Sequence, residues 1–190
     1  EGDIVLDVCA APGTKTLQLA NIVGINGMIL ASDISQERLS LGQKDEKRHK
    51  KSNIEWSLKD ARKDSFKMAD KILIDAPCSG TGVIGRKPEI RWRRRERDLK
   101  KFADTQFSIL KNCSKYLKVG GFLVYATCSI EPEENLMVVE HFLNYNSNFA
   151  IDNIPDKVNK LWVKNSIALN ILPQEHGLDG IFAMRMKRIF

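Results

Sequence analysis

The sequence predicts an α/β fold: a doubly wound, mostly parallel sheet with helices on both faces. Three observations lead to this prediction. Short and almost continuously apolar runs, typical of strands that are buried on both sides, alternate with segments of helical periodicity. Such alternation indicates strand–helix–strand units, which build parallel sheets. After Asn148 the pattern changes, and two late apolar segments are predicted to pair antiparallel at the C-terminal edge of the sheet.

The individual elements follow from these patterns in chain order. Five strands are expected where apolar runs occur, at residues 4–8, 28–31, 54–58, 71–74 and 121–126. Between and after them, helices are expected where apolar residues recur every three to four positions, at residues 14–23, 36–50, 97–117 and 133–143. The two late strands lie in the segments SIALNILP and GIFAMRMKRIF, which QEHGLDG connects.

Polar and small residues follow most of these strands directly. They are the segment CAAPGTK at residues 9–15, Asp33, Asp60, DAPC at residues 75–78 and TCS at residues 127–129. In an open sheet of this kind, ligands bind beyond the carboxyl ends of the strands. We therefore expect all five groups to converge on one edge of the sheet and to form the functional site.

Length, hydropathy and charge restrict the possible classes of protein further. With 190 residues, 43% hydrophobic and 28% charged, the chain is expected to form one folded domain. No apolar run approaches the ~20 residues that span a bilayer, no cleavable signal is visible, and a cytoplasmic protein is expected. The net charge of +6 is concentrated in RKPEIRWRRRERDLKK, residues 86–101, which holds nine basic and three acidic residues. This basic run predicts a phosphate-binding surface, and the alternative is a solvated helix face.

The four cysteines are not arranged as metal ligands. The chain has no CxxC pair, its three histidines are scattered, and no metal is expected. Cys113 lies in a helical pattern and is expected in the core. Cys9, Cys78 and Cys128 each follow a strand-like run, where a core cysteine is not expected. Cys78 and Cys128 are therefore candidates for chemistry, with a small buried side chain as the alternative for each.

The first half of the chain favours an adenosine ligand without phosphates. Its small-residue loop lacks both GxGxxG and the Walker spacing, which disfavours a dinucleotide or a triphosphate and hence a dehydrogenase. Asp33 is suited to hold a ribose hydroxyl pair, with Arg38 nearby, and Asp60 to meet an adenine edge. S-adenosylmethionine fits this description. Each acid alone is more often a helix cap, but three in strand register are harder to explain in that way.

These motifs resemble the RNA cytosine-5 methyltransferases of the Sun/Fmu type. The resemblance covers nearly all of the chain: GDIVLDVCAAPGTKT, DAPCSGTGVIGRKPEIRW, YATCSIEPEEN and LPQEHGLDGIFAMRMKR. It implies a Rossmann-like class I S-adenosylmethionine-dependent methyltransferase domain over residues 1–190, with the family's RNA-recognition elements upstream of Glu1 and absent from the chain. It also implies that the small-residue loop contacts the methionine part of the cofactor. The expected cofactor-binding residues are Cys9, Ala10, Ala11, Pro12, Gly13, Thr14, Lys15, Asp33, Arg38, Asp60 and Asp75.

Thr14 departs from the family, which usually has glycine there, and is expected to cap the first helix. Spacing alone does not decide whether Cys78 or Cys128 attacks the substrate. The resemblance implies that Cys128 is the nucleophile, that Cys78 helps to release the product and that Asp75 contacts the cytosine ring nitrogen. Lys15 is expected to neutralise a phosphate or to orient Asp75.

The expected substrate is RNA, with ribosomal RNA implied by the resemblance. A target base must be unpaired or flipped out of a helix before a thiol can reach its ring. Residues 80–85 are expected to close over that base, and the residues expected to bind RNA are Arg86, Lys87, Arg91, Trp92 and Arg93. Trp92 is available for stacking on a base, or else packs against the sheet. The alternative functions are a catalytically silent RNA-binding module of the same fold and, more weakly, a DNA cytosine methyltransferase.

Overall fold

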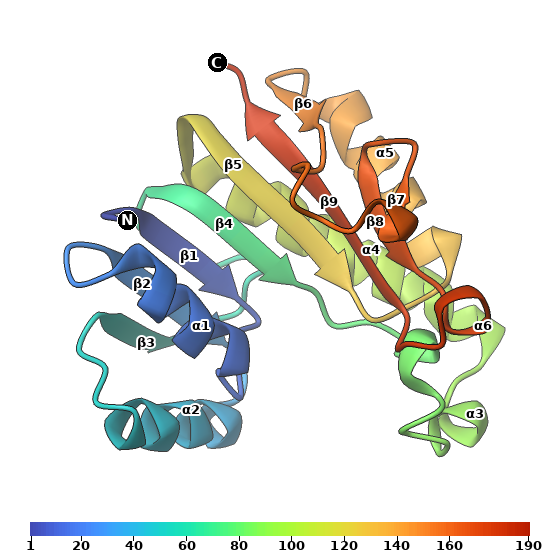
Figure 1. Ribbon diagram of the computed structural model, residues 1–190, viewed down its shortest axis with the longest axis horizontal. Coiled ribbons are helices and arrows are strands. Elements are labelled where there is room, and N and C mark those ends of the chain that lie inside the picture. The colour runs from blue at the N-terminus through green and yellow to red at the C-terminus, as the bar shows by residue number, and fades with distance from the viewer.

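A nine-stranded sheet runs through the whole molecule in the computed structural model, which describes residues 1–190 (Figure 1). The strands are β1 (Ile4–Val8), β2 (Met28–Asp33), β3 (Ile54–Leu58), β4 (Ala69–Asp75), β5 (Leu117–Thr127), β6 (Phe149–Asp152), β7 (Val163–Lys164), β8 (Ala168–Ile171) and β9 (Ile181–Arg188). The α-helices are α1 (Thr14–Val23), α2 (Gln36–Arg48), α3 (Ile90–Arg93), α4 (Glu96–Cys113), α5 (Leu136–Tyr145) and α6 (Pro173–His176). Four short 3₁₀ turns complete the structure: η1 (Thr81–Val83), η2 (Ser114–Tyr116), η3 (Pro132–Glu134) and η4 (Lys160–Trp162).

The first five strands are parallel, as the sequence predicts. Their spatial order is β3-β2-β1-β4-β5, so the chain reverses its direction of travel across the sheet between β3 and β4. The arrows of β1, β4 and β5 in Figure 1 consequently point toward the same edge. This reversal brings the ends of β1 and β4 together, and such a switch point is where open α/β sheets bind ligands.

The C-terminal strands form the antiparallel edge that the sequence predicts. β8 and β9 pair antiparallel, with β9 next to β5 and β8 beyond it. β6 also pairs with β9, and β7 pairs with β8; neither of these strands was expected. β6 and β7 have only four and two residues, so no alternation of apolar and polar side chains is long enough to reveal them.

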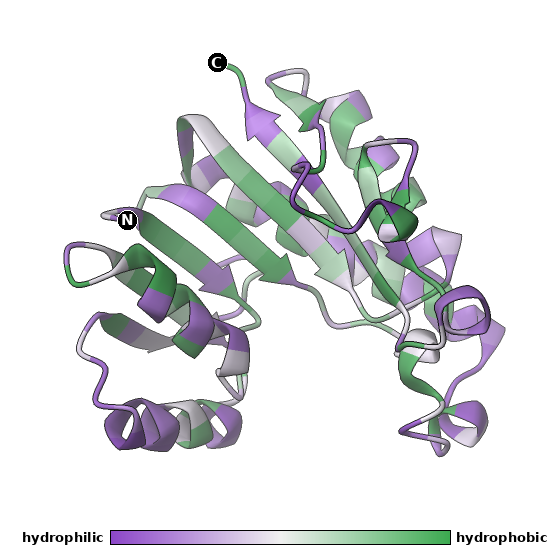
Figure 2. Cartoon of the chain, in the orientation of Figure 1, coloured by the Kyte–Doolittle hydropathy of each residue, from purple (hydrophilic) through white to green (hydrophobic).

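Two apolar clusters, on the two faces of the sheet, hold the helices. Val5 belongs to a cluster with α1, while Leu6 belongs to a larger cluster with α4 and α5. Successive residues of a strand point to opposite faces, so β1 contributes to both clusters. Figure 2 shows the hydrophobic colouring along β1, β4 and β5 and the hydrophilic colouring of α2 and α3. None of the helices combines the length and apolarity that crossing a bilayer would require.

Three helix assignments differ from the sequence prediction. The helix expected at residues 133–143 starts at Leu136, because Pro132–Glu134 form a 3₁₀ turn first. The helix expected at residues 97–117 ends at Cys113, where another 3₁₀ turn leads into β5. The short helix α3 lies inside the basic run and was not expected.

Candidate active site at the carboxyl edge of the sheet

Two cavities lie side by side where β1, β2 and β4 end. The larger, about 260 Å³, is lined by Cys9, Asp33, Arg38 and Asp60 among others. The smaller, about 110 Å³, is lined by most of the small-residue loop together with Lys15 and Asp75. Cys9 lines both, so the two cavities adjoin. The structure therefore gathers on one edge the residues that the sequence assigns to the cofactor.

The small-residue loop passes between β1 and α1 in a conformation that requires glycine at one position. Gly13 has φ = 107°, and a Cβ on it would lie 2.8 Å from the Trp56 ring. The loop is held by a hydrogen bond from the Ala11 amide to Asp33 Oδ2 at 3.1 Å. Gly13 occupies the N-cap of α1 and Thr14 is the first helical residue, with no side-chain cap. The expectation that Thr14 caps this helix is wrong, because Gly13 holds the N-cap position and the helix already begins at Thr14.

Asp33 connects the loop, β2 and α2. Its carboxylate is buried and accepts hydrogen bonds from the amides of Ala11 and Ser35, at 3.1 and 3.0 Å. Arg38 lies 3.7 Å from this carboxylate and donates to the Ala11 carbonyl. A carboxylate has about four acceptor sites, so Asp33 retains acceptor capacity for a ligand.

Asp60 is engaged by its neighbour. Arg62 donates to both carboxylate oxygens, at 2.9 and 2.7 Å. These bonds hold the pKa of Asp60 at about 2. Asp60 is therefore a charged acceptor at the wall of the larger cavity, and its guanidinium partner lines the same wall.

Asp7 is a site residue that the sequence reasoning missed. It lies in β1, is buried, and accepts a hydrogen bond from Thr16 Oγ1 at 2.6 Å, whereas its other oxygen, Oδ1, has no partner. Burial raises the pKa of Asp7 to about 7. Because Asp7 also lines the smaller cavity, the free oxygen is an acceptor for a bound donor. The only sequence signal was an acid inside an otherwise apolar run.

The two cysteine motifs meet at the end of β4 and β5. Cys78 Sγ lies 3.2 Å from Cys128 Sγ, although the residues are fifty positions apart. The hydrogen bond from Cys78 lowers the pKa of Cys128 to about 7. The same bond, together with burial, raises the pKa of Cys78 well above its ordinary value. The pair therefore ionises at Cys128 while Cys78 keeps its proton.

Asp75, just before the first cysteine motif, is paired with Lys15. The Lys15 ammonium lies 2.6 Å from Asp75 Oδ2, and both residues line the smaller cavity. Of the two roles expected for Lys15, this contact fits the orientation of Asp75. The bond also joins the end of β4 to α1, so the cysteine half and the cofactor half of the site are in direct contact.

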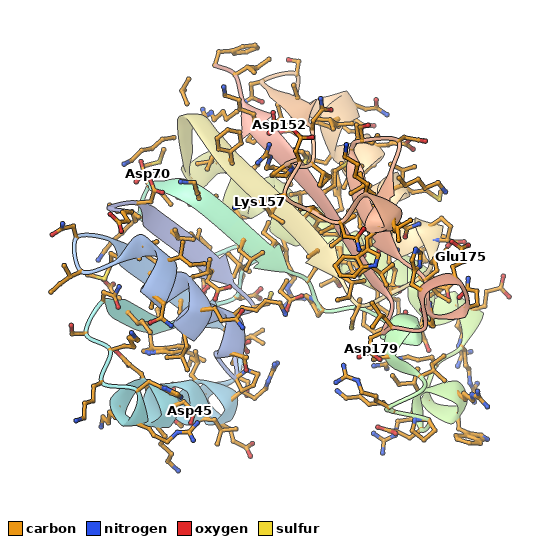
Figure 3. All side chains as sticks on the ribbon, in the orientation of Figure 1. Asp45, Asp70, Asp152, Lys157, Glu175 and Asp179 are labelled. Carbon is orange, nitrogen blue, oxygen red and sulfur yellow. The ribbon has the colours of Figure 1, made fainter.

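The part of the basic run around α3 projects from the rest of the molecule (Figure 1). Trp92 is 78% exposed, so the alternative that it packs against the sheet is wrong. Arg86, in contrast, forms an ion pair with Asp179, which Figure 3 labels in the loop before β9. Arg94 is exposed, and its Nε donates to the Ser79 carbonyl at 3.1 Å. Arg91 and Arg94 also line a cavity of about 360 Å³.

Gly82 anchors the segment of residues 80–85 through backbone hydrogen bonds on two sides. Gly82 is buried; its amide donates to the Cys128 carbonyl at 3.0 Å, and its carbonyl accepts from the Gly180 amide at 2.7 Å. A Cβ on Gly82 would lie 2.6 Å from the Gly180 carbonyl oxygen. η1 is therefore fixed between β5 and the loop before β9 in this structure, and the closing of residues 80–85 over a base stays a prediction.

Comparison with known proteins identifies the family. Residues 1–187 match the family model described as 16S rRNA methyltransferase RsmB/F. The chain belongs to this family. The ribosomal RNA small subunit methyltransferase B of Enterobacter sp. (strain 638) is 41% identical over 197 residues, which cover 97% of the chain and 42% of that protein. The probable methyltransferase B of Bacillus subtilis (strain 168) is 35% identical, over 98% of the chain and 43% of that protein.

A solved structure supports the same fold. NSun6 from Pyrococcus horikoshii, crystallised with SFG, is 30% identical with a TM-score of 0.85, over 99% of this chain and 48% of that one. The resemblance inferred from the cysteine motifs is thus confirmed, as is the mostly parallel methyltransferase fold with antiparallel strands beyond β5. This RsmB/F chain spans less than half the length of the curated relatives that it matches.

Proposed function

We propose that this RsmB/F chain transfers a methyl group from S-adenosylmethionine to carbon 5 of a cytosine in ribosomal RNA, through a transient bond between Cys128 and the base. The observation that carries the proposal is the thiol pair. Two cysteines 3.2 Å apart, one with a pKa near neutrality and the other protonated, provide a nucleophile and a proton-holding partner. Such a pair has no evident use in a protein that only binds RNA.

The chemistry requires electron density on the pyrimidine ring. The electron pair of the Cys128 thiolate forms a bond to carbon 6, and the ring's double-bond electrons become available at carbon 5. Asp75, held by Lys15, contacts the ring nitrogen and stabilises the altered ring. Bound S-adenosylmethionine supplies the electrophilic methyl group. A base, water in the simplest case, then takes the carbon 5 proton. The electron pair of the broken C–H bond restores the double bond between carbons 5 and 6 and expels the Cys128 thiolate, which leaves beside the Cys78 thiol.

The cofactor is assigned to the two adjoining cavities. The methionine part fits the smaller one, where the unpartnered Oδ1 of Asp7 suits an ammonium group. Asp33 would hold the ribose hydroxyls with Arg38 beside it, and Asp60 would lie by the adenine in the larger cavity. The remaining residues assigned to it come from the loop: Cys9, Ala10, Ala11, Pro12, Gly13, Thr14 and Lys15.

The RNA is assigned to the basic run. Lys87, Arg91 and Arg93 would contact phosphates, and the exposed ring of Trp92 would stack on a base near an unpaired or flipped target cytosine. Arg86 remains part of this surface, although its charge is partly offset by Asp179. A ribosomal substrate would be met in the cytoplasm, where this family member is expected to act.

Covalent trapping tests the proposal directly. Full-length protein is incubated with cofactor and a small-subunit ribosomal RNA transcript, then separated on a denaturing gel. Cys78→Ala should accumulate a protein–RNA adduct because release is impaired, and Cys128→Ala should form none. Cys113→Ala, a matched change at a cysteine in the core, should turn over without accumulating an adduct.

The opposite pattern would reverse the two cysteine roles. Absence of tritium transfer from labelled cofactor to RNA by the wild-type protein would rule out the activity itself. A DNA competitor of the same sequence should not reduce transfer to RNA, and its success as a methyl acceptor would contradict the proposed substrate.

A further inference from the structure

Behind the two thiols lies a buried carboxylate that the proposed chemistry does not use. Glu134 ends η3 and is fully buried. None of the ion pairs in the structure includes it. A buried carboxylate without a cation is costly unless several hydrogen bonds satisfy it, so its retention calls for an explanation.

The donors to this carboxylate come from both cysteine loops. The amide of Ser79 donates to Glu134 Oε1 at 2.8 Å, and the Ser79 hydroxyl donates to Oε2. The Ser129 hydroxyl donates to Oε2 at 2.7 Å. Ser79 directly follows Cys78 and Ser129 directly follows Cys128. One side chain therefore holds the residue after each thiol.

A fourth donor comes from α4. Gln106 Nε2 donates to Glu134 Oε1 at 2.9 Å and to the Pro77 carbonyl at 3.0 Å. Cys78 is thus held on both sides, through Pro77 and Ser79. The carbonyl of Glu134 in turn accepts from the Tyr125 hydroxyl in β5 at 2.6 Å. The acid thereby joins the loop after β4, the loop after β5, and α4.

We propose that Glu134 is a positioning residue that keeps the sulfur atoms of Cys78 and Cys128 in hydrogen-bond contact. Each serine that Glu134 holds is the residue directly after a cysteine, so fixing the serines limits how far the sulfurs can move apart. The two serine hydroxyls lie 3.2 Å apart, the same separation as the two sulfurs. This inference rests on the proposed function for its catalytic meaning, but not for its geometry.

The negative charge of Glu134 also favours ionisation of Cys128 over Cys78. The hydrogen bond with Cys128 and burial are the main causes of the raised pKa of Cys78, and the nearby charge of Glu134 adds to them. The other charged or titratable groups that act on the pair are Asp75, Lys87 and Tyr125. A negative charge behind Cys78 disfavours a second thiolate, so the single negative charge of the pair stays on Cys128.

The test uses thiol reactivity, which needs no RNA. Full-length protein is treated with iodoacetamide at a series of pH values, and each cysteine is followed by peptide mass spectrometry. In the wild type, Cys128 should react before Cys78, with a midpoint near pH 7. Glu134→Gln keeps the shape but removes the charge and two acceptor positions. It should reduce the preference for Cys128 at least about tenfold and should move the midpoint upward.

A second readout separates positioning from loss of fold. Glu134→Gln should lower the rate of adduct formation with RNA at least about tenfold while leaving KM for the cofactor within about twofold. Asn53→Ala is the matched control, since Asn53 is also buried and donates to two carbonyls, at Ala20 and Gly24, far from the thiols. It should lower thermal stability without altering thiol selectivity.

Milder variants keep the inference testable if Glu134→Gln does not fold. Ser79→Ala and Ser129→Ala should each reduce the preference for Cys128 by a smaller factor than Glu134→Gln does. The double variant should reduce it by less than the product of the two single factors, because both serines act through one carboxylate. Unchanged selectivity in these variants and in Glu134→Gln would overturn the inference. The two proposals can fail separately. If the wild type methylates no RNA, but Glu134→Gln still has lower thiol selectivity than the wild type, the proposed function fails and the positioning role stands.

Discussion

Individual residues determine the chemistry at the carboxyl edge of the sheet. Asp7 is an example, because it is a buried carboxylate with an oxygen available to a ligand. Its carboxylate has one partner, Thr16, and one free oxygen at the wall of the smaller cavity. Its pKa of about 7 lies above the ordinary value of 3.8. Between pH 3.8 and about pH 7, Asp7 therefore keeps its proton in the folded state but has lost it in the unfolded chain. The free energy of unfolding consequently falls as the pH rises through this range.

We expect Asp7→Asn to stabilise the ligand-free protein at pH 8. Each pKa unit corresponds to about 1.4 kcal/mol, so the stability lost by the wild type between pH 4 and pH 8 is on the order of 4 kcal/mol. Asparagine does not titrate and keeps an acceptor for Thr16. Thermal melts should show equal stability near pH 4 and a higher Tm for the variant at pH 8.

The same substitution should weaken the affinity for S-adenosylmethionine at least about tenfold, measured by titration calorimetry, because the ammonium loses a charged acceptor. A variant with a lower Tm at every pH and unchanged affinity would contradict this account of Asp7.

At the residue scale, the sequence predicted where the site residues lie better than it predicted which side chains they contact. The approach of Cys78 to Cys128 was foreseeable, since parallel strands end at a common edge. Asp7 and Glu134 were missed for a shared reason. An acid in an apolar strand or in a PEEN turn is an unremarkable surface residue until tertiary packing removes it from water.

At the level of elements, the parallel strands and the helices that follow them were predictable because each has a long apolar pattern. The short elements were not. α3 has four residues and lies in a run of arginines, and β6 and β7 obtain their stability from pairing with β9 and β8 rather than from their own sequences. Tertiary contact, not local propensity, creates these elements.

The segment around α3 is expected to supply the salt-dependent part of RNA affinity. Each phosphate contact contributes a slope of about −0.7 to −0.9 in a plot of log affinity against log salt. Removing two contacts with Arg91→Ala and Arg93→Ala should therefore reduce the slope by about 1.5, as measured by filter binding. Trp92→Ala should lower affinity at all salt concentrations, by about 1–3 kcal/mol if it stacks on a base.

Lys47→Ala with Lys50→Ala provides the charge-matched control. These lysines lie in and just after α2, apart from α3 in Figure 1. An equal change of slope in both double variants would show that net charge, rather than the basic run, governs RNA binding.

For the molecule as a whole, the site divides into two halves that meet at the pair of Lys15 and Asp75. Most of the lining of the cofactor cavities comes from β1–β3, α1, α2 and their loops, with Asp75, Pro77 and α4 completing the walls, whereas the thiols follow β4 and β5. The cofactor half should consequently bind its ligand without help from the cysteines.

We expect S-adenosylmethionine at a hundred times its Kd to stabilise the protein by about 2.7 kcal/mol. For a domain of this size that corresponds to an increase in Tm of roughly 5–11 °C. Differential scanning fluorimetry should give the same shift for the wild type and for Cys128→Ala. A shift that disappears in Cys128→Ala would contradict the division into two halves.

The position of β9 has a consequence for biosynthesis. Between the end of β5 at Thr127 and the start of β9 at Ile181, the ribosome adds more than fifty residues, which takes roughly 3–10 s. During that interval β5 is an open edge, with unpaired amide and carbonyl groups that can recruit another chain. The nascent protein therefore remains vulnerable to aggregation until residues 181–188 have emerged, even though its first four strands and their helices are already complete.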